Sequence, residues 1–178
     1  MPRIVKGITV GMVLAMALSA ILYRLYHSGI WLTAAVTFGT AAYHLAAHLL
    51  IGDLVNAIMH NRADYRKKWY QPRSFEPALY RFLKVKKWKN KMPTFEPGTF
   101  SAKEHSFDEI AQVMCQSEVV HELCILSSFL PLAASLKFGA FPVFLVTSIA
   151  VACFDMALVM MQRYNRPRII KLANRQKV

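Results

Sequence analysis

Four long apolar runs divide the sequence, and they limit the fold more than any other feature. The runs lie at about residues 8–24, 30–59, 117–136 and 141–161. Each is close to or above the ~20 residues that an α-helix needs to cross a hydrocarbon core of ~30 Å. We therefore predict an all-α integral membrane protein, in which four transmembrane helices form a single membrane domain over residues 1–178.

Basic residues are distributed unevenly between the segments that join these runs. The chain has 22 Lys and Arg against 10 Asp and Glu. Two basic residues precede the first run, twelve lie in the long connection 61–111, and six lie in the C-terminal tail 162–178. Cytoplasmic segments of membrane proteins carry an excess of Lys and Arg. We therefore expect a cytoplasmic loop, cytoplasmic N and C termini, and a multi-pass protein of the cell (plasma) membrane, specifically a bacterial inner membrane.

The cytoplasmic loop mixes aromatic residues with its lysines. In PALYRFLKVKKWK, residues 77–89, the apolar side chains recur at three- and four-residue spacing, with lysines largely between them. This pattern predicts a basic amphipathic helix that lies at the membrane interface and binds anionic lipid headgroups. A short helix packed on its own loop is the alternative. Nucleic acid is not an expected partner, because the segment is tethered at a bilayer.

The loop also contains a signal for the start of the next helix. Ser106 is followed three residues later by Glu109. This spacing predicts a capping box, in which each residue satisfies a backbone N–H of the other. We expect a helix to begin there and to run into the third apolar run.

Ionisable side chains lie inside the apolar runs, where they are costly and therefore indicate function. His44 and His48 are one helical turn apart, and Glu118 and His121 are three residues apart, so each pair shares a face. With a rise of ~1.5 Å per residue, most of these groups fall in the cytoplasmic half of the membrane. The alternatives are structural. A buried histidine can hydrogen-bond a backbone carbonyl, and an acid near the end of the last run can pair with an arginine that follows it. The full set is His44, His48, Asp53, Glu118, His121, Glu122 and Asp155.

A zinc site is the metal alternative for this group. His44 and His48, together with Glu118, are residue types that bind zinc. The chain lacks an HExxH motif. We predict no metal.

The most specific motif of the chain is QRYNRPR at residues 162–168. A tryptophan–lysine segment and a Glu-x-x-His pair accompany it. Through these motifs the chain resembles the glycosyl-4,4'-diaponeurosporenoate acyltransferases, small membrane enzymes of staphyloxanthin biosynthesis, over about residues 44–172. The sequence departs from the family pattern at Met92, Ser117 and Asp155, where leucine, alanine and asparagine are usual. The matching residues of the two weaker motifs are Val85, Trp88, Lys89, Pro93, Glu118 and His121.

The resemblance implies transfer of a fatty acyl group to a hydroxyl of a glycosylated lipid, such as a carotenoid glycoside. Acyl-CoA is the expected co-substrate, and no further cofactor is expected. Acylation of a hydroxyl needs a base, and neutral histidine suits that role near pH 7. We predict that His121 or His48 is the base and that Glu118 orients it.

Guanidinium groups bind phosphates well, so we expect Arg163, Arg166 and Arg168 to bind the donor phosphates, with Pro167 fixing the backbone between them. Further polar residues are expected to contact donor or acceptor. The complete predicted binding set is Gln162, Arg163, Tyr164, Asn165, Arg166, Arg168, Asp155, Trp88, Lys89, His44 and Asp53.

Two other functions fit the same pattern. A small four-helix methyltransferase also places arginines and acids at the cytoplasmic mouth, and labelled S-adenosylmethionine would distinguish it. A non-enzymatic scaffold would use its loop lysines to bind lipid or a partner and would not need the intramembrane histidines. A homodimer is a further alternative, because four helices alone enclose little space for a lipid.

Overall fold

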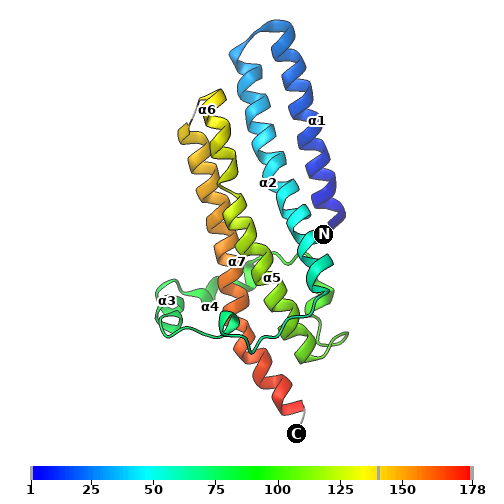
Figure 1. Cartoon of the computed structure of the whole chain (residues 1–178), viewed down its shortest axis with the longest axis vertical. Coiled ribbons are helices and arrows are strands. Elements are labelled where there is room, and N and C mark those ends of the chain that lie inside the picture. Colours follow the sequence, from blue (N-terminus) through cyan, green and yellow to red (C-terminus); the bar gives the residue numbers. More distant parts are fainter. Residues whose placement is uncertain (1, 140, 177–178) are drawn as a thin grey trace. The chain divides into compact units, whose positions relative to one another are not determined.

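The computed structural model describes residues 2–139 and 141–176, and helices make up most of that part of the chain (Figure 1). No strand occurs in the described ranges. The four longest helices are α1 (Pro2–Tyr26), α2 (Gly29–Met59), α5 (Phe107–Ser127) and α7 (Phe141–Gln176). The short helices are η1 (Lys68–Tyr70), α3 (Glu76–Phe82), α4 (Val85–Trp88), η2 (Lys89–Lys91), η3 (Pro97–Phe100), η4 (Leu130–Ala134) and α6 (Ser135–Phe138).

Four helical stretches are long and apolar enough to cross a membrane, which confirms the predicted number. They are Arg3–Tyr26, Gly29–Met59, Phe107–Phe138 and Phe141–Gln176. Large apolar side chains such as Leu14, Leu25 and Ile30 are exposed on them. Exposed apolar surface of this extent suits contact with lipid tails.

The last two long helices differ from their predicted bounds. Within the predicted span 117–136, α5 ends at Ser127, and a 3₁₀ helix with Pro131 near its start follows. Proline has no backbone N–H for an α-helical hydrogen bond. In contrast, α7 does not stop at residue 161 but continues to Gln176 with Pro167 inside it. The predicted basic tail is therefore largely an extension of the last helix.

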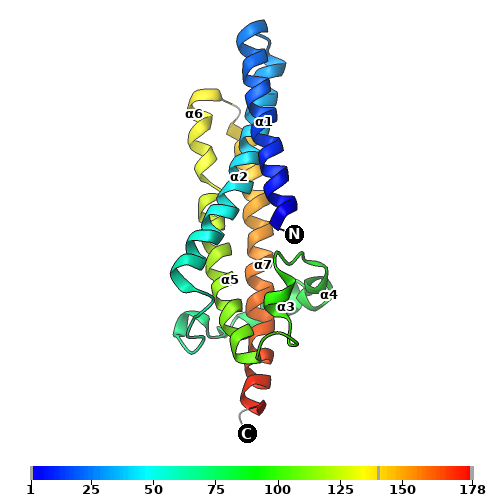
Figure 2. The same ribbon diagram turned by 90° about the vertical axis from the view of Figure 1, so that its right-hand side faces the viewer.

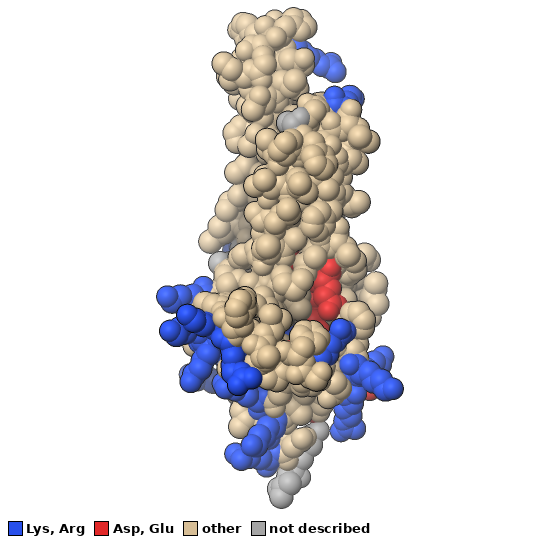
Figure 3. Space-filling view, turned by 90° about the vertical axis from the view of Figure 1, so that its left-hand side faces the viewer, with Lys and Arg blue, Asp and Glu red and all other residues tan. Residues whose placement is uncertain are grey.

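The described chain divides into two compact units. The first contains residues 1–51 and 124–153, and the second contains residues 52–123 and 154–178. All ten acidic residues belong to the second unit, as do all basic residues except Arg3, Lys6, Arg24 and Lys137. In Figure 3 most of the blue Lys and Arg side chains gather in one region of the surface. The polar chemistry of the chain is thus concentrated in that unit.

In the first unit, α1 and α2 lie side by side (Figures 1 and 2). A Cβ atom added at Gly39 would be 3.1 Å from the Met16 sulfur, so the Met16 side chain packs closely against Gly39 where the two helices approach. Elsewhere in this unit, the Tyr43 hydroxyl donates to the Ser127 carbonyl at 2.8 Å and joins α2 to the end of α5.

In the second unit, the start of the loop packs against α5 and α7. The buried centre consists of Tyr65, Tyr70, Ala111 and Cys115. The Gln116 side chain also accepts from the Asn61 backbone N–H at 2.7 Å and so fastens the end of α2 to α5. The loop is therefore a packed part of the second unit.

The segment predicted as one amphipathic helix forms two short helices, α3 and α4, so its predicted continuity is wrong. Lys84 separates them with a left-handed φ of 52°. A non-glycine residue in that conformation interrupts a right-handed helix. The Trp88 indole N–H donates to the Leu83 carbonyl at 2.9 Å across the break. The position of this segment at a membrane interface remains a prediction.

The capping box at the start of α5 is confirmed. The Ser106 backbone N–H donates to the Glu109 carboxylate at 2.8 Å, and the Glu109 backbone N–H donates to the Ser106 hydroxyl at 3.3 Å. These bonds satisfy backbone donors that a helix start leaves unpaired. The box fixes where α5 begins.

Replacing Ser106 with alanine should loosen the first turn of α5, because a lost cap costs about 1 kcal/mol. We expect amide hydrogen exchange in that turn to become about fivefold faster. Ser74→Ala, at an exposed loop position, is the matched control. Equal exchange in both variants would show that the cap does not stabilise the helix.

Candidate active site

A buried carboxylate on α5 forms the centre of the second unit. Glu118 is fully buried, and one of its oxygens accepts from Arg163 while the other accepts from Arg166. Removing a carboxylate from water costs free energy unless it is paired with a cation and hydrogen-bonded. Two guanidinium groups meet both requirements.

The two arginines reach one carboxylate because they are three residues apart on α7. Residues at this spacing share a helix face. Pro167 follows Arg166 directly and is exposed, whereas Arg166 is only 2% exposed. The QRYNRPR segment therefore turns its first two arginines inward from a continuous helix.

The same two arginines hold the backbone of the loop. Arg163 donates to the carbonyls of Trp69 at 3.1 Å and Gln71 at 2.9 Å. Arg166 donates to the Tyr70 carbonyl between them at 2.5 Å. Three successive loop carbonyls are thus bound to one face of α7.

Glu76 completes the charge balance of this cluster. Its carboxylate accepts from Arg163 Nη2 at 2.6 Å and from Arg163 Nε at 2.9 Å. The Tyr80 hydroxyl donates to the other Glu76 oxygen at 2.9 Å, and burial together with this carboxylate raises the pKa of Tyr80 above its ordinary value. Two carboxylates therefore neutralise two guanidiniums, and we call Glu76, Glu118, Arg163 and Arg166 the buried ion cluster.

This geometry revises the expected role of two arginines. Arg163 and Arg166 were expected to bind donor phosphates, but their guanidinium groups point at protein carboxylates and carbonyls. Sequence reasoning also missed Glu76, which is only 4% exposed. Its only local signal is its position before a proline at the start of α3, and that signal does not indicate a distant partner.

A histidine–aspartate pair lies one turn further along α5. His121 Nδ1 is 2.8 Å from an oxygen of Asp155, a fully buried residue of α7. An ionised Asp155 carboxylate only accepts hydrogen bonds, so beside it Nδ1 would donate and Nε2 would carry the lone pair. The carboxylate that orients His121 is thus Asp155 and not Glu118, because Glu118 is committed to the arginines.

His121 lines a cavity of about 120 Å³ in the second unit. The turn-rich segment Pro93–Phe100 forms one side of this cavity, and α5 and α7 form the rest. The Gln162 amide donates to the Ser117 hydroxyl at 3.1 Å, and both residues line the space. The remaining lining residues from the two long helices are Leu158 and Met161. The cavity is therefore lined by a histidine together with apolar and polar side chains.

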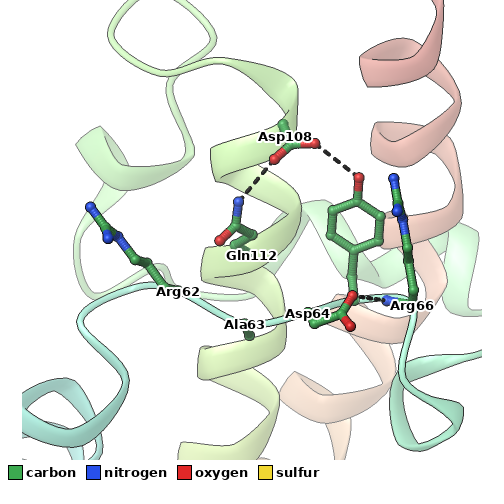
Figure 4. A pocket seen from close by; sticks show the side chains of 7 residues that line it. Arg62, Ala63, Asp64, Arg66, Asp108 and Gln112 are labelled. Carbon is green, nitrogen blue, oxygen red and sulfur yellow. Dashed lines mark hydrogen bonds between the residues drawn. The ribbon is translucent and has the colours of Figure 1, made fainter.

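A second pocket lies where the loop begins (Figure 4). It has a volume of about 430 Å³ and is open to solvent. Asp108 accepts from the Tyr65 hydroxyl and from the Gln112 amide, both at 2.9 Å. Arg62 and Arg66 lie on either side of these residues in the figure. No histidine lines this pocket, so the cavity at His121 is the better candidate for acyl chemistry.

The other residues of the QRYNRPR segment meet the tryptophan–lysine segment. Lys89 Nζ donates to the Asn165 side chain at 2.7 Å and lies 5.4 Å from the centroid of the Tyr164 ring. The Arg168 guanidinium carbon lies 5.2 Å from the same centroid. Trp88 points instead to the Leu83 carbonyl.

Three further residues of the predicted site are Asp53, His44 and His48. Asp53 is exposed in the second unit and does not join the buried ion cluster. His44 and His48 belong to the first unit, where His48 Nδ1 lies 2.9 Å from the His44 carbonyl oxygen. This contact agrees with the simpler alternative of a histidine bonded to a backbone carbonyl. A role for either histidine in catalysis remains a prediction.

The model of one protein family matches the chain over residues 66–175. The family is described as CrtO, glycosyl-4,4'-diaponeurosporenoate acyltransferase. The chain belongs to this family. It is therefore an acyltransferase, which excludes the methyltransferase and scaffold alternatives. No match was found among curated proteins or among solved structures.

The matched range agrees with the geometry of the candidate site. It contains the buried ion cluster, His121 and Asp155. It begins later than the resemblance at residue 44 suggested, and it leaves out His44, His48 and Asp53.

Removing the Glu118 carboxylate should destabilise the protein strongly, because two buried guanidiniums lose their partner. We expect Glu118→Ala to lower the free energy of unfolding by about 3–5 kcal/mol, measured by denaturant unfolding in detergent. Glu122→Ala is the matched control one turn away, where a partly exposed carboxylate accepts, within the described part of the chain, only from the Trp69 indole at 3.1 Å. Equal losses in the two variants would contradict the central role of Glu118.

Proposed function

We propose that the protein transfers a fatty acyl group from acyl-CoA to a hydroxyl of a glycosylated lipid, such as a carotenoid glycoside. The observation that carries this proposal is the His121–Asp155 pair at the cavity of the second unit. Family membership supports acyl transfer in carotenoid glycoside modification. The identities of donor and acceptor are part of the proposal.

His121 is the proposed general base. Its Nε2 lone pair takes the proton of the acceptor hydroxyl while the oxygen attacks the thioester carbonyl. The tetrahedral intermediate then collapses, and the coenzyme A sulfur leaves with the proton that the imidazolium returns. Asp155 stabilises the imidazolium that forms between these steps and keeps the proton on Nδ1.

The cavity walls support the same chemistry. The Gln162 side chain has a second N–H besides the one donated to Ser117, so it can donate to the oxyanion of the intermediate. The segment Pro93–Phe100 covers one side of the cavity. A covered site limits the access of water, which would otherwise hydrolyse the thioester.

The proposed location follows from the spans and the charge distribution. Four helices long enough to cross a membrane support a multi-pass protein. The basic second unit would face the cytoplasm, where acyl-CoA is available. The lipid acceptor would reach His121 from the bilayer, and anionic headgroups would neutralise the exposed lysines of the loop.

Replacing His121 with alanine should lower acyl transfer at least ~100-fold, because general acid–base catalysis contributes about 10²–10⁴-fold. The measurement is incorporation of labelled acyl groups from acyl-CoA into extracted glycolipid. Asp155→Asn should also lower turnover, since an amide no longer holds the required tautomer. His105→Ala, a histidine of the loop, is the matched control.

Full activity of His121→Ala, with normal expression and folding, would refute the assigned base. A parallel reaction with acyl carrier protein as donor would test the choice of acyl-CoA. Faster transfer from the carrier protein would identify it as the donor in place of acyl-CoA, and the assignment of His121 as the base would stand.

A further inference from the structure

Two cations approach one aromatic ring where the QRYNRPR segment meets the loop. Lys89 Nζ and the Arg168 guanidinium carbon lie 5.4 and 5.2 Å from the centroid of the Tyr164 ring. Tyr80 packs edge-on against that ring, with 5.4 Å between the centroids. The ring is thus fixed between α3 and α7, and it fixes the two cations in turn.

These two cations lack the neutralising partners that the neighbouring arginines have. Among the described residues, neither Lys89 nor Arg168 forms an ion pair with a carboxylate. Arg163 and Arg166, by comparison, are paired with Glu76 and Glu118. Burial and the nearby charge of Arg168 lower the pKa of Lys89 below its ordinary value. An anion bound beside them would relieve this repulsion.

Both groups retain hydrogen-bond donors for such an anion. Lys89 has three N–H donors and gives one to Asn165. Arg168 is exposed, and its side chain donates to no residue in the described part of the chain. Its planar fork suits two oxygens of one phosphate, while the Lys89 ammonium acts as a compact charge.

We propose that Lys89 and Arg168, held by Tyr164 and Asn165, form a binding site for phosphate groups. Given the proposed function, the coenzyme A part of the donor is one source, since it carries several phosphates. The phosphate of an anionic lipid headgroup is the other source with the same chemistry. In this proposal Arg168 and Lys89 bind the phosphates. Arg163 and Arg166 do not, because they are committed to the buried ion cluster.

The test is calorimetric titration of coenzyme A into the full chain in phosphatidylcholine nanodiscs. A lost hydrogen bond to a charged group corresponds to about tenfold in affinity. We expect Lys89→Gln and Arg168→Gln each to weaken binding about tenfold and the double variant to weaken it more. Lys87→Gln and Lys171→Gln, at exposed positions on the same two segments, should bind coenzyme A normally.

A second arm identifies the source of the phosphate. The variants are compared for their enrichment of phosphatidylglycerol from mixed vesicles. Loss of coenzyme A binding supports the donor, and loss of phosphatidylglycerol enrichment alone supports the headgroup. A folded double variant that retains both, or a wild-type protein that binds neither, overturns the site.

The proposed base is tested separately by binding to His121→Ala. This variant should bind coenzyme A normally while it no longer transfers acyl groups. If it remained active while the double variant lost binding, the phosphate site would stand and the proposed base would fail. Lys89→Arg, which keeps the charge, should retain most of the binding and so excludes a folding defect at that position.

Discussion

A carboxylate buried away from water must be both neutralised and hydrogen-bonded, and Glu118 depends on two arginines of α7 for this. The same guanidiniums bind three successive carbonyls of the loop, so one cluster joins α5, α7 and the loop. A hydrophobic contact alone would not fix the direction of these groups, because it is non-directional. The cluster therefore sets the register of the two helices in the second unit.

That register also places the proposed catalytic groups. His121 lies three residues after Glu118 on α5, and Asp155 lies two turns before Gln162 on α7, so both pairs use the faces that the cluster brings together. The segment Pro93–Phe100 then closes one side of the cavity. The second face of the QRYNRPR segment carries Tyr164 and Arg168, which meet Lys89. One helical segment thus contributes residues both to the buried ion cluster and to the proposed phosphate site.

The sequence allowed some of these features to be predicted, and the others depend on contacts between distant residues. Apolar run lengths predicted four spans, and the spacing of Ser106 and Glu109 predicted a helix start, because both signals are local. The QRYNRPR segment was recognised as special, but Arg163 meets Glu76 across 87 residues, and no local pattern indicates such a pairing. The break at Lys84 was also missed, since two short helices have the same apolar spacing as one long helix.

The central claim is that the arginines of α7 hold the loop onto the second unit. Amide hydrogen exchange of residues 66–76, compared between the wild type and Arg163→Gln or Arg166→Gln, tests it most directly. We predict slow exchange in the wild type and much faster exchange in both variants, while the amides of α1 remain unchanged. Equal protection of residues 66–76 in all three proteins would contradict the account.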